Sequence, residues 1–270
     1  MKPIILALSS LNSVNAHYVF SRLIANNIVT KDFEYIRPLP LKNDGSDWTG
    51  VLAPLTDPLS LAFRCGPNAT TSGPQTKTME VRAGDTVGFE MGEPHFRYGN
   101  FDPYDVPRLY HPGPLTVWLS KAPNDDLDSY TGDGDWFKIL QVIERTEQSI
   151  ELDKRVLFQE YPSTRQWGAY LTPNWNFTIP ATTPPGKYLL RFEHIQAGIV
   201  DGSYVAKTQY YQNCAQISIV NEGSRIGTPG PLVKIPGTYA DGQPEFIWDD
   251  WDMNFDIKKF KMPGPAVWQG

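Results

Sequence analysis

His17 could bring two nitrogen donors to a metal ion, provided that the chain is cut directly before it. Residues 1–16 contain one positive charge, a short apolar run over residues 3–8 and Val14-x-Ala16 at their end. These features are typical of a secretory signal peptide that is cleaved after Ala16. Cleavage would free the α-amine of His17 beside its imidazole, and both groups are good copper ligands. A histidine packed in the core is the alternative reading, but it has no reason to stand at a cleavage point.

Two further segments carry side chains that could complete such a site. His111 begins a Pro-Gly-Pro turn, which would hold a metal ligand with little conformational freedom, although a solvated turn histidine fits the turn equally well. Gln209 and Tyr211 are two residues apart in a strand-like stretch, so their side chains point to the same face. Taken alone, Tyr211 reads better as a core aromatic close to Cys214.

The elements that must position these side chains are short strands. Several alternate apolar and polar residues, as half-buried antiparallel strands do, and turns rich in Gly and Pro separate them. Helical periodicity is scarce, with room for one or two turns within 144–156. The pattern predicts an all-β sandwich with long loops, one domain over 17–270, and a C-terminal tail from Pro229 that wraps it. The predicted strands are 28–30, 33–36, 78–81, 86–89, 115–119, 176–179, 188–193 and 215–220.

Composition limits the partners. The chain has 24 basic and 30 acidic residues, a formal net charge of −6, and no basic cluster, so nucleic acid is not an expected partner. No stretch after the leader is long and apolar enough to span a bilayer. We therefore expect a secreted, extracellular and soluble protein that acts as a monomer and has no membrane partner.

Two cysteines and two sequons agree with secretion. Cys65 and Cys214 are more readily bridged than free in an oxidising compartment, and closing a loop of about 150 residues would stabilise the fold by roughly 5 kcal/mol. Asn68 and Asn176 begin Asn-x-Thr sequons, which predict N-glycosylation, with chance occurrence as the alternative.

The motifs together resemble the fungal lytic polysaccharide monooxygenases of auxiliary activity family 9, formerly glycoside hydrolase family 61. The resemblance covers essentially all of the chain from His17 onward, with ordered matches at compatible spacing. The matching segments are His17-Tyr18, 61–65, 83–87, 110–114, 119–123, 135–139, 177–180, 185–191, 209–214 and 263–268.

The resemblance implies an immunoglobulin-like antiparallel β-sandwich with one copper ion on a flat face. His17 would bind copper through its α-amine and a ring nitrogen, His111 would bind through a ring nitrogen, and Tyr211 would lie on the axis. Gln209 and Tyr211 would be the catalytic residues beside the metal. An external small-molecule or protein electron donor, with O2 or H2O2 as co-substrate, would support oxidative cleavage of insoluble cellulose, hemicellulose or a related β-1,4-glucan at C1 and/or C4.

One expected residue is missing. The family usually carries a further histidine about seven residues after the position of Arg191, where this chain has Gly198. His194 is four residues earlier, some 13 Å along a strand, and is interpreted as solvent-facing or strand-packed. His95, in a separate loop, is another candidate for the missing donor. Because such outer residues tune the metal, the alternative function is a copper-binding relative with lost or altered oxidative activity.

The substrate face is predicted less sharply. Trp248 and Trp251 could stack on sugar rings, or they could anchor the C-terminal tail in the core. The second disulfide that is common in the family is not expected here, since the stretch 180–183 lacks the cysteine often found there. A non-catalytic carbohydrate-binding sandwich would need no terminal histidine, and a serine hydrolase is disfavoured because Gly-x-Ser-x-Gly does not occur.

Overall fold

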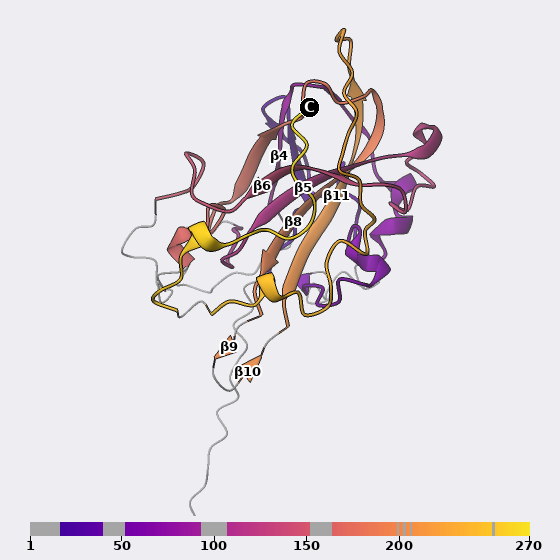
Figure 1. Cartoon of the computed structure of the whole chain (residues 1–270). Helices are drawn as coiled ribbons and strands as arrows, with labels where there is room; N and C mark the ends of the chain where they lie inside the picture. The colour runs from indigo at the N-terminus through magenta and orange to yellow at the C-terminus, as the bar shows by residue number, and fades with distance from the viewer. Residues whose placement is uncertain are drawn as a thin grey trace, which may run out of the picture.

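Strands in two packed sheets dominate the computed structural model of the chain (Figure 1). The first sheet has the order β2-β1-β4-β7 and the second the order β3-β11-β8-β5-β6, while β9 and β10 form a small hairpin. The structure describes residues 17–39, 52–92, 107–151, 164–198, 200–201, 204–205, 207–249 and 252–270. The strands are β1 (Arg22–Ala25), β2 (Ile28–Val29), β3 (Met79–Arg82), β4 (Thr86–Glu90), β5 (Leu115–Lys121), β6 (Phe137–Val142), β7 (Asn174–Thr178), β8 (Gly186–Gln196), β9 (Val200–Asp201), β10 (Tyr204–Val205) and β11 (Gln209–Val220).

The predicted β-sandwich is confirmed, with local differences. Seven of the eight predicted strands overlap observed ones, but residues 33–36 form a turn in which only Ile36 bridges to Ala215. Phe33 has a left-handed backbone (φ 55°), and its amide donates to the Ser21 carbonyl, which turns the chain away from a sheet. The pair β3–β11 is parallel, unlike the antiparallel pairing that the alternation of 78–82 predicts, and β3 and β4 belong to different sheets.

Short 3-10 helices, rather than α-helices, occupy many of the loops. Residues 144–151 do not form the predicted helical turns; Glu144 pairs with Trp167 instead, and residues 152–163 lie outside the described residues. Among the described residues, no helix combines the length and the apolar character that crossing a bilayer requires. The 3-10 helices are η1 (Leu61–Phe63), η2 (Ala69–Thr71), η3 (Gly73–Gln75), η5 (Pro123–Asp125), η6 (Thr164–Gln166), η7 (Pro244–Phe246) and η8 (Ile257–Lys259).

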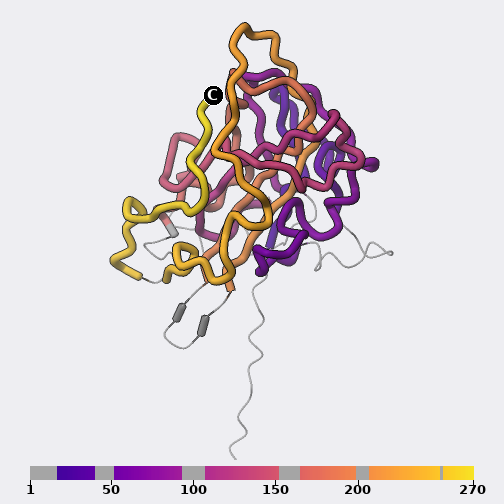
Figure 2. The backbone as a smooth tube through the Cα atoms, turned by 45° about the vertical axis from the view of Figure 1, so that its right-hand side comes forward, coloured from indigo at the N-terminus to yellow at the C-terminus, as the bar shows by residue number. Residues whose placement is uncertain are grey.

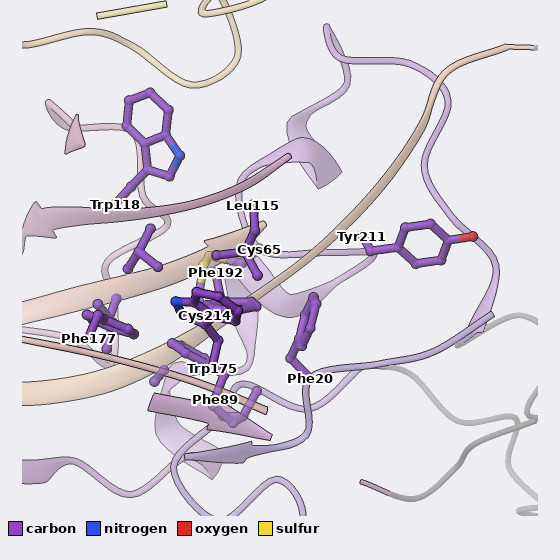
Figure 3. Packing of buried hydrophobic residues seen from close by; sticks show 14 of the residues in the cluster. Phe20, Cys65, Phe89, Leu115, Trp118, Trp175, Phe177, Phe192, Tyr211 and Cys214 are labelled. Carbon is purple, nitrogen blue, oxygen red and sulfur yellow. A yellow bond between two sulfur atoms is a disulfide. The ribbon is translucent and has the colours of Figure 1, made fainter. Parts of the chain in front are cut away.

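Aromatic rings fill the space between the two sheets. The ring of Phe192 on β8 lies 4.5 Å from that of Phe20 and 4.7 Å from that of Phe89 on β4, measured between centroids. In Figure 3 the ring of Tyr211 points away from this group. Because alternate residues of a strand share a face, His194 and Gln196 lie on the same inner face of β8 as Phe192.

The C-terminal segment covers the outer face of the larger sheet, which confirms the predicted wrapping tail. It runs alongside the strands in both views (Figures 1 and 2). Val233 pairs with Trp136, the Trp268 amide donates to the Lys138 carbonyl, and Tyr239 donates to Glu193. Beneath the tail, Arg191 and Glu193 form a fully buried ion pair at 2.6 Å, so each charge offsets part of the cost of removing the other from water.

Candidate metal centre

Three segments that are far apart in the sequence bring the predicted ligands together at one end of the sandwich. His17 precedes β1, His111 precedes β5, and Tyr211 lies on β11. The ring centroids are 6.2 Å apart for His17 and His111, 6.1 Å for His17 and Tyr211, and 5.6 Å for His111 and Tyr211. The three side chains therefore surround one small volume.

The turn after His111 is held firmly against β8. A Cβ atom on Gly113 would come within 1.8 Å of the Ile195 carbonyl oxygen, so this close approach requires glycine. The Ile195 amide then donates to the Pro114 carbonyl, and β5 pairs with β8 from the next residue. His111 thus stands on a backbone that is fixed to the central strand.

Burial keeps both candidate histidine ligands neutral. It lowers the pKa of His17, and it lowers the pKa of His111 well below the ordinary 6.5, with further lowering by the neighbouring His194 and His17. Nε2 of His111 is shielded from solvent and has no hydrogen-bond partner in the described part of the chain. A neutral ring with an unshared electron pair on a shielded nitrogen is suited to bind a metal.

The donor set fits copper better than a carboxylate-bound metal. Among the described residues, no three His, Cys, Asp or Glu side chains gather into a metal-binding group, so two imidazoles supply the side-chain nitrogens here. In the uncut chain the backbone nitrogen of His17 is an amide, and only cleavage before His17 converts it to an amine. Nitrogen-rich sites with few ligands favour Cu(II) among divalent metals.

Tyr211 and Gln209 do share a face, as their spacing predicts. The Tyr211 hydroxyl donates to Oε1 of Gln209 at 2.7 Å, and the Tyr211 ring stacks on Tyr18 at 4.2 Å. Burial raises the pKa of Tyr211 well above its ordinary value, so the phenol stays protonated. A neutral phenol is a weak ligand, so Tyr211 would contribute little to holding a metal beside the two histidines.

Sequence reasoning missed Tyr18, and it placed His194 without a role. His194 is fully buried, so the strand-packed interpretation holds and the solvent-facing one is wrong. Its Nδ1 shares a hydrogen bond with the Tyr18 hydroxyl at 2.5 Å. Burial lowers the pKa of His194 to about 3. The adjacency of Tyr18 to His17 and the alternation of β8 were the available signals.

Gly198, which stands where the family has a histidine, makes a backbone hydrogen bond to the C-terminal segment. The Gly198 amide donates to the Phe246 carbonyl of η7, just beyond the end of β8. Gln196, which sequence reasoning also missed, pairs with Gln209 across the sheet, and its Oε1 is buried without a hydrogen-bond partner among the described residues. His95 lies outside the described residues.

Trp248 is an anchor of the tail in this structure. Only 8% of it is exposed, and its ring lies 4.8 Å from that of Trp167 and 5.7 Å from that of Phe260. A groove of about 490 Å³ runs beside this cluster, lined also by Asp252 and Lys259. The burial favours the anchoring alternative for Trp248, while Trp251 lies outside the described residues.

The disulfide is present, and the two sequon asparagines differ in exposure. Cys65 and Cys214 are bonded, as predicted, which ties the segment after η1 to β11. Asn68 is exposed at the start of η2, and Asn176 is half-buried on β7. Glycosylation at both asparagines stays a prediction.

Fold and site together define a β-sandwich protein in which two neutral histidine rings and a tyrosine converge at one end. The profile of auxiliary activity family 9 (formerly GH61) matches residues 17–259. The chain therefore belongs to this family, whose members are copper-dependent lytic polysaccharide monooxygenases that use external reductants with O2 or H2O2.

Individual relatives agree with this assignment. The chain is 37% identical over 262 residues to AA9 family lytic polysaccharide monooxygenase G of Aspergillus tamarii, covering 95% of this chain and 67% of that protein. It is 36% identical to AA9 family lytic polysaccharide monooxygenase H of Malbranchea cinnamomea, covering 98% and 97%. A cellulose-active polysaccharide monooxygenase from M. thermophila shares the fold, with a TM-score of 0.64 at 22% identity over 94% of this chain and 100% of that one.

The buried histidines predict that the metal-free protein loses stability in mild acid. Below pH 6.5 the unfolded chain takes up a proton on His194, whereas the folded ring stays neutral down to about pH 3. Stability is therefore fully present above pH 6.5 and falls by up to about 1.4 kcal/mol per pH unit below it. Urea unfolding between pH 7 and pH 4 measures this slope. The stability of His194→Leu should depend less steeply on pH than that of the parent. An identical slope would contradict the assignment of the acid sensitivity to His194.

Proposed function

We propose that residues 1–16 are removed on secretion and that the extracellular domain 17–270 binds one copper ion between His17 and His111. The observation that carries the proposal is the convergence of these two neutral rings with Tyr211 from three separate segments. The α-amine of His17 would be the third nitrogen donor. Amine and imidazole donors suit copper, and the copper dependence of the family supports the choice.

The surrounding side chains would orient the site and exclude water. Bound copper would supply one-electron redox chemistry, with an external reductant and O2 or H2O2 as co-substrate. The protonated phenol of Tyr211 would lie beside the metal without contributing charge, and its hydrogen bond to Gln209 would hold both side chains in place. Gln209 would then keep its amide group free to donate to an oxygen atom at the site.

The proposed substrate is insoluble cellulose or a related β-1,4-glucan, cleaved oxidatively at C1 and/or C4. The fold relative from M. thermophila is described as cellulose-active, which supports this choice. Monomeric action and a small-molecule or protein electron donor complete the proposal.

Copper-loaded protein beginning at His17, incubated with ascorbate and amorphous cellulose, is expected to release aldonic-acid or C4-oxidised oligosaccharides. The matched control is His111→Ala, which loses one ring donor and should release none above background. Mass spectrometry of the soluble sugars gives the result. Copper bound to the parent with no oxidised sugar from any β-glucan would overturn the proposed activity and favour a copper-binding protein with altered chemistry.

A further inference from the structure

His194 is the common neighbour of all three segments that carry the proposed ligands. On one side it pairs across the sheet with Tyr211 of β11, and on the other it pairs with Leu115, the first residue of β5 after the His111 turn. Its ring reaches the N-terminal segment, where Nδ1 shares a hydrogen bond with the Tyr18 hydroxyl. No other residue of β8 pairs with Tyr211, and β8 is the strand that lies between β11 and β5.

The hydrogen bond to Tyr18 is the contact that orients the His194 ring. His194 is fully buried, and burial lowers its pKa, so the ring is neutral. A neutral imidazole has one donor and one acceptor nitrogen, and a phenol can donate or accept, so either partner can satisfy the other. Nε2 of His194 has no hydrogen-bond partner among the described residues, so the bond at Nδ1 holds the ring in place.

The Tyr18 ring lies against two of the proposed ligands. Its ring stacks on Tyr211 with centroids 4.2 Å apart and lies 5.9 Å from the ring of His111. Tyr18 is itself 2% exposed, so a hydroxyl without a partner would be costly in this position. The bond to His194 therefore restrains the Tyr18 ring, and a single peptide bond joins Tyr18 to His17.

Stability alone does not call for a histidine here. An apolar side chain at this inner-face position would avoid the cost of burying an imidazole, and replacing both partners of a buried hydrogen bond by apolar groups is often nearly neutral. A buried hydrogen bond forms in only one arrangement of the surrounding segments, whereas apolar side chains can pack in several. Precise placement matters most at a metal centre.

We propose that His194 is a positioning residue of the copper site, and that its hydrogen bond to Tyr18 sets the placement of His17 relative to His111 and Tyr211. The proposal rests on the copper site proposed above. It assigns a role to a histidine that does not bind the metal, at a place other than Gly198.

The test compares Tyr18→Phe, His194→Leu and the double variant in protein beginning at His17. Each single variant should weaken Cu(II) binding about 10-fold and shift the Cu(II) EPR parameters, since changes next to metal ligands have effects of this size. The double variant should weaken binding no further, because both single variants remove the same bond. His194→Asn, which keeps an acceptor near the position of Nδ1, should restore much of the parent EPR spectrum.

Tyr239→Phe is the matched control. It also removes a buried tyrosine hydrogen bond to β8, but on the outer face, where Tyr239 donates to Glu193. It should lower stability and leave copper affinity and EPR spectrum at the parent values. If Tyr18→Phe, like Tyr239→Phe, lowers stability but leaves the copper affinity and the EPR spectrum unchanged, the hydrogen bond is only structural and the proposal is wrong. Because Tyr18→Phe keeps the aromatic ring, this comparison does not depend on whether His194→Leu folds. Failure of the parent to bind copper would instead overturn the proposed site itself.

Discussion

Protein that begins at Ala16 instead of His17 is expected to bind copper about 100-fold more weakly than protein that begins at His17. Retaining one residue keeps the His17 ring but turns its α-amine into an amide, so one nitrogen donor is lost. A structural zinc site with four donors binds with about 10–16 kcal/mol, which makes one donor worth about 3 kcal/mol, or about 10² in Kd. Competition titration with a chelator of known copper affinity measures the difference.

His17→Ala tests the same residue from the other side. It keeps the terminal amine and loses the ring, so a similar loss of affinity is expected. Combined with His111→Ala, which removes the second ring, the loss should reach about 10⁴ in Kd if each donor contributes about 3 kcal/mol. The unfolding curve of metal-free His17→Ala serves as the control, since this ring is only partly buried and should contribute little to folding. Parent-like copper affinity in His17→Ala would contradict the predicted use of the His17 ring.

Removal of the Cys65–Cys214 disulfide should destabilise the protein by about 4–5 kcal/mol. The bond closes a loop with a sequence separation of 149, and in the chain-entropy model a loop of this length is strongly constrained in the unfolded state. Both cysteines are fully buried, so alanine at each position leaves no unpaired polar group. Urea denaturation of the double alanine variant measures the change in the free energy of unfolding.

The same variant shows what the disulfide does for the site. Cys214 is three residues beyond Tyr211, but β11 also pairs with β8 and β3 along most of its length. The Cu(II) EPR spectrum of the folded variant should therefore match that of the parent. The parent, unfolded and refolded in dithiothreitol, is the control, and it should lose somewhat less stability because it keeps both buried sulfur atoms. A decrease of less than about 1 kcal/mol in the free energy of unfolding would contradict the chain-entropy explanation for this disulfide.

Much of the architecture follows from local patterns. Alternation in β3, turn residues such as Gly84 between β3 and β4, and the Gly/Pro-rich tail are short-range signals, so the sandwich and its wrapping tail could be predicted. The strand predicted at 33–36 failed because the amide of Phe33 bonds to Ser21 rather than to a neighbouring strand. Periodicity does not report such a contact. The direction of β3 could not be predicted either, since a parallel pair depends on the path of the whole chain.

The sequence by itself determined which donors exist: a histidine at a predicted cleavage point, a second on a rigid turn, and a tyrosine and glutamine on one strand face. These are matters of residue type and local spacing. Only the tertiary structure decided that His194 is buried against Tyr18 and that Trp248 packs in the tail. His194 is four positions before the place where the family has a histidine, so along the strand it looks misplaced. In the folded protein its ring contacts a side chain of the N-terminal segment. Tyr18 supplies that partner from 176 residues away, a separation that no local pattern spans.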